Sequence, residues 1–336
     1  MQHAVSTVMT AVYEADFLGF SYGFRPGRSQ HDALDALWVG LMQRRVNWVL
    51  DADIQGFFDT LDHEWLMRFV AHRIADRRVL RLVRKWLRAG VLDGDTWTAT
   101  PVGTPQGAVL SPLLANIYLH YVFDRWVHQW RQQEATGDVV VVRYADDIVM
   151  GFEHRADAER CLAAWHARLA QFGLILHPAK TRLLEFGRHA AANRTQRGEG
   201  KPETFDFLGF THYCGKFRSG QYLVRRQTMR TRLRRKLQQV KAELYRRRHE
   251  AVPVQGAWVQ RVIRGHFAYY GVPGNQSGLE HFRAAVTRLW HRALRRRGQR
   301  RPLTWDRLGR VVRRWIPRVR IVHPYPEVRF AVRHPR

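Results

Sequence analysis

The chain has 336 residues, 45% of them hydrophobic, so it can bury a large core and is expected to hold two or more substructures. None of its apolar runs approaches the 18 or so residues needed to span a bilayer, and the N-terminus lacks the basic-then-apolar pattern of a secretory signal. Cys161 and Cys214 have no CxxC spacing, which argues against a zinc site or a disulfide framework. These observations exclude a disordered or membrane-spanning chain and predict a cytoplasmic protein without a membrane partner.

The net charge of +27 is concentrated at one end of the chain. Residues 1–213 contain 24 Lys or Arg and 24 Asp or Glu, whereas residues 214–336 contain 32 and 5, a difference of +27. Such a segment repels itself unless a polyanion neutralises it, and binding to a phosphate backbone also releases counterions. An anionic membrane surface is the competing interpretation. We favour nucleic acid, because the arginines are spread over several predicted helices with apolar stripes of their own.

In the first two thirds, helices and strands alternate irregularly. The apolar run 48–50 predicts a strand that leads into Asp51 and Asp53, whose spacing places both on one face. Ser111-Pro112 predicts the start of a helix, because proline suits a first turn, and a second helix is predicted over 156–172, closed by Gly173.

Two β-branched runs, at 139–142 and 148–150, flank Tyr144-Ala145-Asp146-Asp147 and predict a hairpin with this tetrapeptide at its turn. Adjacent carboxylates repel unless a divalent cation that prefers oxygen ligands, such as Mg²⁺, lies between them. A surface turn is the alternative, since Asp is common in turns for its bonds to the local backbone. With Asp53 as a third carboxylate, the sequence predicts a two-metal site suited to phosphoryl transfer.

The pattern of apolar residues in the last third of the chain predicts helices. Residues 194–201, rich in Gly and charge, predict an exposed hairpin tip or loop before them. Three amphipathic helices then follow from apolar residues spaced three or four apart, and they can pack into a bundle with basic outer faces. Their stripes are Leu233, Leu237, Val240 and Leu244; Val259, Ile263, His266 and Tyr270; and Leu279, Phe282, Val286, Leu289 and Ala293.

Asp53-Ile54-Gln55-Gly56-Phe57-Phe58-Asp59, followed about 90 residues later by Tyr-Ala-Asp-Asp, resembles the bacterial group II intron reverse transcriptase/maturase family. Further blocks are similar to those of the family in the same order, so the resemblance covers essentially the whole chain. These blocks lie at 17–29, 103–112, 173–181, 205–210, 265–271 and 320–326.

The resemblance implies an α+β fold, with a right-hand polymerase palm of mainly antiparallel sheet and packed helices followed by an α-helical basic thumb or maturase domain. The expected domains are partial fingers at 1–45, the palm at 46–213 and the thumb at 214–336. The implied function is RNA-directed DNA polymerisation by two-metal nucleotidyl transfer for a group II intron, with intron RNA binding, splicing assistance and a role in intron mobility.

The implied partners are intron RNA, an RNA template, a DNA primer, dNTPs and two Mg²⁺ ions, in a cytoplasmic, nucleoid- or ribonucleoprotein-associated setting. A homodimeric state stays open.

The resemblance also assigns site residues. Asp53, Asp146 and Asp147 are the expected catalytic and metal-binding carboxylates, and the Ile54 carbonyl is expected to complete a metal shell. Phe58 is the expected gate against a 2′-hydroxyl, with a core aromatic as the alternative. The other assignments are Gln106, Gly107 and Lys180 for nucleotide binding; Tyr144, Arg25, Arg28, Leu208 and Gly209 for primer or template; and Arg234, Arg235, Lys236, Arg295, Arg296 and Arg297 for RNA binding by the thumb. For Lys180, Arg25 and Arg28 the alternative is an ordinary solvated side chain.

One departure from the family pattern bears on activity. Relatives carry a further fingers segment ahead of the 17–29 block, whereas here that block follows only 16 residues, so an N-terminal truncation is expected. Two further hypotheses therefore stand beside the polymerase. One is a catalytically impaired protein that acts only as an intron RNA-binding splicing cofactor, and the other is a non-catalytic fragment.

Overall fold

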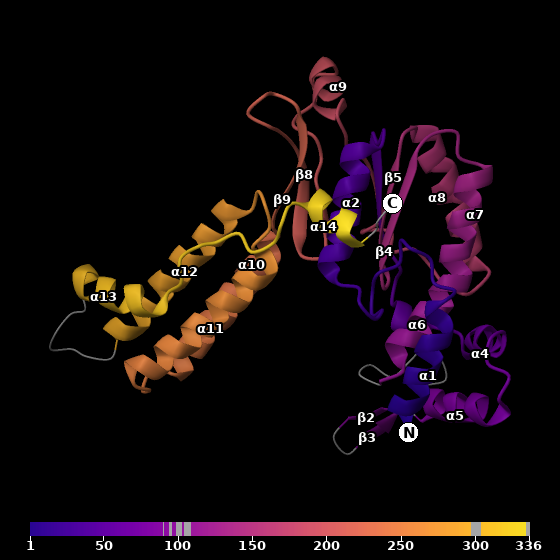
Figure 1. Ribbon diagram of the computed structural model, residues 1–336, viewed down its shortest axis with the longest axis horizontal. Helices are drawn as coiled ribbons and strands as arrows, with labels where there is room; N and C mark the ends of the chain where they lie inside the picture. Colours follow the sequence, from indigo (N-terminus) through magenta and orange to yellow (C-terminus); the bar gives the residue numbers. More distant parts are fainter. Residues whose placement is uncertain (90, 94–95, 99–102, 104–108, 297–303, 334–336) are drawn as a thin grey trace. The chain divides into compact units, whose positions relative to one another are not determined.

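The computed structural model describes residues 1–89, 91–93, 96–98, 103, 109–296 and 304–333 (Figure 1). The chain divides into two compact units. The first comprises Met1–Glu203, Lys216–Leu223 and Phe330–Arg336, and the second comprises Thr204–Gly215 and Val224–Arg329. Among the helices of the described ranges, none has the length and apolar character that crossing a bilayer requires.

The centre of the first unit is a four-stranded sheet in the order β4-β5-β1-β6, and all neighbouring strands are antiparallel. The predicted hairpin is confirmed, because β4 pairs with β5 and the tetrapeptide at 144–147 connects them. The predicted strand that leads to Asp53 is β1, in the middle of the sheet. The strands are β1 (Trp48–Asp53), β4 (Val139–Tyr144), β5 (Asp147–Phe152) and β6 (Arg182–Glu185).

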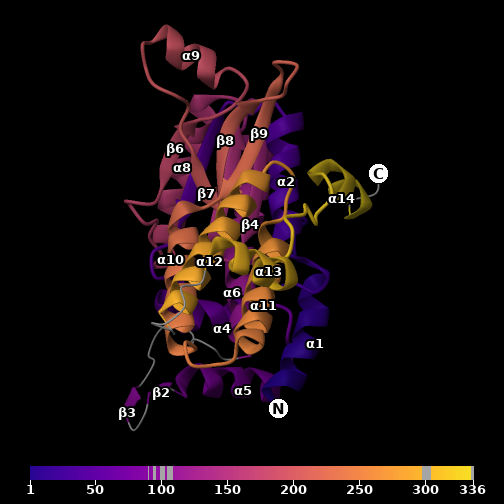
Figure 2. The same cartoon turned by 90° about the vertical axis from the view of Figure 1, so that its left-hand side faces the viewer.

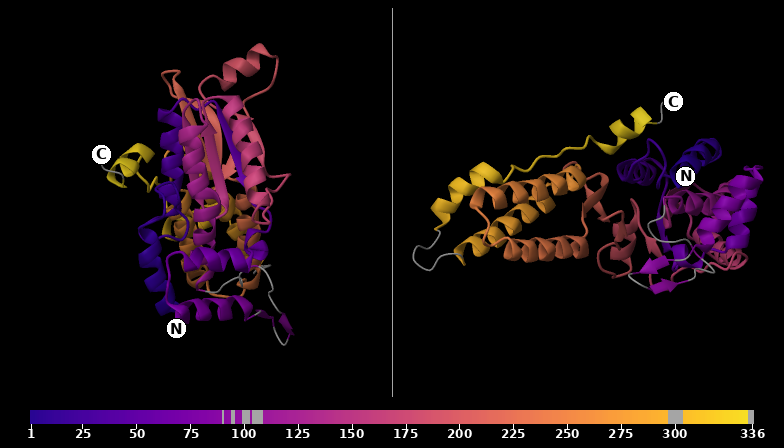
Figure 3. Two further views of the ribbon diagram at one scale, coloured as in Figure 1. Left: turned by 90° about the vertical axis from the view of Figure 1, so that its right-hand side faces the viewer. Right: turned by 90° about the horizontal axis from the view of Figure 1, so that it is seen from below.

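Helices cover both faces of this sheet. Val49 and Leu50 point to opposite faces of β1, and both are fully buried. Helix α2 (Gln30–Gln43) contacts β4 and β5, and α8 (Arg155–Ala170) contacts β1 and β5. The left view in Figure 3 shows these two helices on opposite sides of the sheet. The end of β1 and the β4–β5 turn are therefore held by a sheet with two buried faces.

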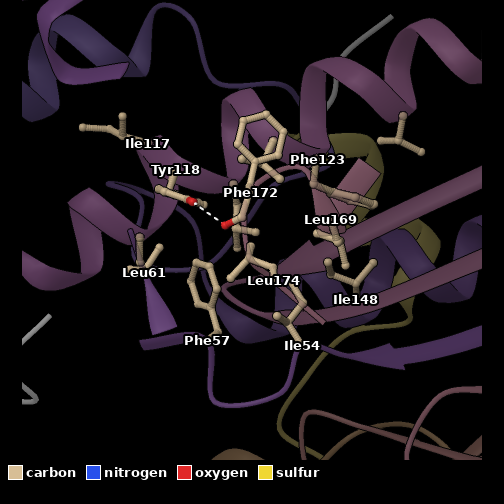
Figure 4. Packing of buried hydrophobic residues seen from close by; sticks show 14 of the residues in the cluster. Ile54, Phe57, Leu61, Ile117, Tyr118, Phe123, Ile148, Leu169, Phe172 and Leu174 are labelled. Carbon is tan, nitrogen blue, oxygen red and sulfur yellow. Dashed lines mark hydrogen bonds between the residues drawn. The ribbon is translucent and has the colours of Figure 1, made fainter. Parts of the chain in front are cut away.

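A cluster of aromatic and aliphatic side chains supports the end of β1 (Figure 4). Ile54 and Phe57 are buried there beside Leu174. The Tyr118 hydroxyl, from α6 (Ser111–Leu119), donates a hydrogen bond to the Phe172 carbonyl at 3.2 Å. This hydrogen bond ties the segment after α8 to the helix that begins, as predicted, at Ser111.

The rest of the first unit is mostly helical. One prediction was wrong: residues 194–196, expected in a loop, form the last turn of α9 (Ala190–Gln196). Consecutive alanines favour that helix, and ion pairs from Arg194 and Arg197 to Glu199 stabilise its end. The remaining elements are α1 (Gln2–Glu14), α3 (Phe57–Thr60), α4 (His63–Ala71), α5 (Arg77–Arg88), β2 (Val91–Asp93), β3 (Thr96–Thr98), a π-helix η1 (His120–Asp124) and α7 (Arg125–Gln133).

The second unit is mainly a helix bundle. Helices α10 (Arg230–Arg246), α11 (Val252–Tyr270) and α12 (Gln276–Arg295) correspond to the three predicted amphipathic helices and run side by side (Figure 2). Their predicted stripes supply the core, with Val240, Ile263 and Val286 almost fully buried. The other elements are the strands β7 (Phe205–Phe207), β8 (Phe210–Lys216) and β9 (Tyr222–Thr228), in one sheet, and the helices α13 (Trp305–Trp315) and α14 (Pro326–Arg333). The tips of β8 and β9 at 216–223 and the end of α14 from Phe330 belong to the first unit.

The predicted fold class is confirmed, since a mainly antiparallel sheet with packed helices is followed by a helical region. The domain bounds 1–45, 46–213 and 214–336 stay predictions.

Candidate active site

Three acidic residues lie at one end of the central sheet. Asp53, the last residue of β1, lies directly opposite Asp147, the first residue of β5. Asp146 precedes Asp147 in the two-residue turn, so all three positions lie within one strand spacing of each other, about 5 Å per step. Burial raises the pKa of the Asp146 carboxyl, and the nearby negative charge of Asp53 adds to the rise. Both effects indicate a concentration of negative charge in a partly desolvated place.

Lys180 contacts this cluster directly. Its Nζ lies 2.7 Å from Oδ2 of Asp53, and this hydrogen bond raises the pKa of the lysine. The backbone supports the contact, because the His177 N–H donates to the Asp53 carbonyl at 2.8 Å and the Lys180 N–H donates to the His177 carbonyl. The Lys180 side chain is still 60% exposed, so it can leave the pair without unfolding its surroundings.

The donor chemistry of the cluster suits a hard divalent cation such as Mg²⁺, which takes carboxylate and carbonyl oxygens. Gln55 and Asp53 form backbone hydrogen bonds with the 175–177 segment, so Ile54, which lies between them, directs its carbonyl to the opposite side, toward β5. Across the described ranges, no three His, Cys, Asp or Glu side chains are already arranged around a metal position.

Phe58 lies five residues after Asp53, on the short helix α3. Gly56 precedes the helix with a φ of +56°, a conformation that glycine adopts readily. The Phe58 ring is half-buried and packs edge-to-face on Phe57 at 5.4 Å, so part of the residue stays accessible. Gly103 lies against α3, where an added Cβ would be 2.7 Å from the Phe58 carbonyl oxygen. The predicted nucleotide contacts Gln106 and Gly107 lie outside the described residues.

Arg25 corrects a prediction. Its guanidinium donates to both carboxylate oxygens of Glu14 and to the carbonyls of Leu18 and Ser21, and its side chain is 3% exposed. The Phe17 carbonyl accepts from the remaining N–H at 3.4 Å, so no donor is left for template phosphates and we regard Arg25 as structural. Arg28 is half-buried over the Tyr22 ring and donates to the Gly19 carbonyl at 2.6 Å.

Tyr144 ends β4 beside the carboxylates. Its ring is half-buried, and its centroid is 6.1 Å from that of Phe24, which is 55% exposed. The two rings form an accessible aromatic surface next to Asp146.

Leu208 and Gly209 lie in the second unit, as the turn between β7 and β8. Both have positive φ, +48° and +82°, which is the pattern of a type I′ hairpin turn. The Tyr269 hydroxyl donates to the Leu208 carbonyl at 2.6 Å, and an added Cβ at Gly209 would be 3.0 Å from the Tyr270 hydroxyl. The turn is thereby fixed to the end of α11.

Two grooves flank α10 in the second unit. The first, about 770 Å³, lies between α10 and α12 and is lined by Arg234, with further cations from both helices. The second, about 890 Å³, lies between α10 and α11 and is lined by Arg235 and Lys236 together with Trp258. Neither has an Asp or Glu among its described lining residues. Arg295 and Arg296 are exposed at the end of α12, and Arg297 lies outside the described residues.

The sequence reasoning missed a polar cluster beneath the 144–147 turn. Arg143, Asp124 and Asn116 are at most 1% exposed, and Arg143 donates hydrogen bonds to both of the others. The signal was available, because an arginine ends a run of four valines and polar residues interrupt the apolar helix that begins at Ser111.

Comparison with known proteins gives consistent matches. A family model described as reverse transcriptase (RNA-dependent DNA polymerase) matches residues 1–212. Protein YkfC of Escherichia coli K12 is 40% identical over 132 residues, and group II intron-encoded protein LtrA of Lactococcus lactis subsp. cremoris is 41% identical over 133. These alignments cover 38% and 40% of this chain, but only 34% and 22% of the relatives' own lengths. The structure of apo telomerase from Candida tropicalis covers 98% of this chain, over 53% of its own, with a TM-score of 0.51 at 10% identity, a likeness of fold alone.

Proposed function

Because the chain belongs to the reverse transcriptase (RNA-dependent DNA polymerase) family, we propose that it extends a DNA primer on an RNA template in the service of a group II intron. The observation that carries the proposal is the position of Asp53 opposite Asp147 and next to Asp146. Carboxylates that converge at the end of a sheet suit nucleotidyl transfer. The intron link is supported by the relatives that are about 40% identical.

Asp53, Asp146 and the Ile54 carbonyl are the proposed ligands of Mg²⁺, with Asp147 supporting them. When bound, Mg²⁺ supplies Lewis acidity toward the primer hydroxyl and the phosphates of the nucleotide. Burial is the main cause of the raised pKa of Asp146, and the negative charge of Asp53 adds to it; a cation bound there would stabilise both carboxylates in their charged form.

Lys180 and Phe58 handle the incoming nucleotide in this proposal. The Lys180 ammonium lies 2.7 Å from Asp53. Once Asp53 turns toward Asp146, the ammonium exchanges this carboxylate for the phosphates of the nucleotide as its hydrogen-bond partner. There it donates hydrogen bonds and a proton to the leaving pyrophosphate. The accessible part of Phe58 lies beneath the sugar and excludes a 2′-hydroxyl by its size.

The two basic grooves beside α10 are the proposed binding surfaces for the nucleic acid backbone. Their cations attract phosphates, and their lining contains no carboxylate among the described residues that would oppose this. Contacts to phosphates fix the position of the nucleic acid on the protein but do not read its base sequence. Leu208, Gly209, Tyr144 and Arg28 are proposed to contact the primer or the template.

Primer extension on poly(rA)·oligo(dT) with dTTP and Mg²⁺ tests the polymerase. We expect extension by the unmodified protein and none by Asp146→Asn. The matched control is Glu159→Gln, which removes the same charge from an exposed position on α8 and should leave the rate unchanged. A folded protein that yields no Mg²⁺-dependent product contradicts the proposal.

A splicing cofactor is the second candidate, favoured by the basic grooves of the second unit. In this case the protein should accelerate self-splicing of a group II intron RNA at low Mg²⁺ concentration, and Asp146→Asn should accelerate it equally. Equal splicing rates with and without protein would exclude this role.

A further inference from the structure

A buried arginine lies directly beneath the predicted catalytic turn. Arg143 is fully buried, and all five of its N–H donors have partners. Nε and Nη2 donate to the Asp124 carboxylate at 2.7 and 2.5 Å, and Nη2 also donates to the Ser21 hydroxyl at 2.7 Å. Nη1 donates to Asn116 Oδ1 at 3.1 Å and to the Ala145 carbonyl at 3.0 Å. This guanidinium therefore connects a helix, a loop and the turn.

The turn that it holds has an unfavourable backbone conformation. Ala145 has a φ of +56°, a region that residues with a Cβ seldom adopt. In a two-residue hairpin turn, a positive φ at the first position is normally supplied by glycine. Such a conformation persists only where the surroundings determine it, and it is concentrated at functional sites. Asp146 is the next residue, so the conformation of Ala145 decides where that carboxylate points.

The second constraint on the turn comes from the 17–29 block. Gly23 lies so close to the turn that an added Cβ would be 2.4 Å from the Ala145 nitrogen. Asn116 Nδ2 donates to the Gly23 carbonyl at 2.7 Å, while its Oδ1 accepts from Arg143. Asn116 thus connects the Gly23 loop on one side of the turn, and Arg143 on the other, to the helix α6.

Asp124 reaches Arg143 from an unusual helical position. It is the last residue of the π-helix η1, whose wider turn holds one residue more than an α-helical turn. One extra residue rotates the positions after it by about 100° relative to a regular helix. π-Helical turns of this kind occur frequently at functional sites. A buried ion pair of this sort is a weak source of stability, so its presence beneath the turn points to a geometric role.

We propose that Arg143 is the positioning residue of the active site and that, with Asn116 and Asp124, it holds Ala145 in its left-handed conformation and so directs Asp146 toward Asp53. This inference rests on the proposed function of Asp146, but it concerns the geometry of the turn and can be tested without catalysis.

The principal test variant is Asn116→Ala. It removes the hydrogen bonds from Asn116 to Gly23 and from Arg143 to Asn116, and it leaves Arg143 paired with Asp124. Ser21→Ala is a milder second variant, because it removes one of the five bonds of Arg143 and folds even if Asn116→Ala does not. Val127→Ala, at a fully buried apolar position on α7, is the control for a general loss of stability. All three are compared with the unmodified chain.

Two measurements separate positioning from general destabilisation. Hydrogen–deuterium exchange of the 144–147 peptide should accelerate in Asn116→Ala, and less in Ser21→Ala, but not in Val127→Ala. The affinity for Mn²⁺ alone, followed by electron paramagnetic resonance, should fall about 10- to 100-fold in Asn116→Ala, the range seen when residues behind a metal ligand are altered. Adding Ala145→Gly, which removes the conformational penalty at the turn, should restore part of that affinity.

The outcomes distinguish the two proposals. Unchanged exchange at 144–147 in both Asn116→Ala and Ser21→Ala, or an equal change in Val127→Ala, overturns the positioning role of Arg143. If the unmodified protein neither binds Mn²⁺ nor extends a primer, the proposed function is wrong, while faster exchange specific to Asn116→Ala and Ser21→Ala would still support the positioning role.

Discussion

Replacing Lys180 by methionine separates a catalytic role from a structural one. The Lys180–Asp53 pair is 60% and 31% exposed, so solvent screens it and its contribution to stability is at most about 1 kcal/mol. A domain with a typical stability of about 5–15 kcal/mol would stay folded after this loss. A proton donor, by contrast, typically contributes about 10²- to 10⁴-fold to the rate. We therefore expect Lys180→Met to keep its unfolding midpoint and to lose about 100-fold or more in the rate of nucleotide addition.

The assay is single-turnover primer extension at saturating dNTP and Mg²⁺, so that neither binding nor product release limits the rate. The matched control is Arg182→Met, because the half-exposed Arg182 side chain pairs with Asp51 at 3.4 Å, two residues before Asp53 on the same strand. A Lys180→Met rate within about threefold of the unmodified rate, or an equal loss in Arg182→Met, would refute the reasoning that the lysine acts on the nucleotide.

Three further predictions concern other parts of the molecule. Phe58→Val should admit ribonucleotides, measured as a fall in the ratio of dTTP to UTP incorporation of at least about tenfold; an unchanged ratio would mean that Phe58 is only a core aromatic. Burial lowers the pKa of His266 to about 4 from a usual value near 6.5, so the unfolded chain binds the proton more tightly than the folded chain. The free energy of unfolding should therefore fall below its value at pH 7 as pH drops from about 6.5 to 4, and at pH 5 the loss should be about 2 kcal/mol. Thermal melts should show a weaker dependence in His266→Phe, which keeps the stacking on Phe282; an identical dependence would be inconsistent with this assignment. Arg235→Ala and Lys236→Ala should each weaken RNA binding irrespective of sequence and reduce the slope of log K against log salt by about 1, and an unchanged slope would place the phosphates elsewhere.

Local patterns predicted the elements around the site well. The two β-branched runs beside Tyr144–Asp147 were sufficient to predict the hairpin. Strand propensity and turn preference depend on residues that are neighbours in the sequence. The meeting of Asp53 with Asp147 depends on strands about 90 residues apart, which no local pattern links; it was expected from the metal chemistry that three carboxylates suit and from the resemblance to a family.

The burial and the binding partners of individual arginines could not be predicted from the sequence. Arg25 and Arg143 have the same residue type as the solvated arginines of α10, yet both are buried against carboxylates that are distant in sequence or on another element. Nothing in a single sequence states which acid an arginine will meet after folding. Likewise, the helix α9 continues to Gln196 inside the segment where a loop was predicted, because the alanines before that segment favour a helix and the glycines come only after its end.

The position of α10 between two grooves has an electrostatic consequence. Polyanions lying on its two flanks would be separated by about one helix diameter, about 10 Å. The Debye length is about 8 Å at physiological ionic strength and about 30 Å at 0.01 M. Repulsion between polyanions on the two flanks would therefore be largely screened at physiological ionic strength but strong in dilute buffer. The second flank to fill should bind more weakly than the first at low salt, and this difference should shrink as salt is added, although each flank alone binds more tightly at low salt.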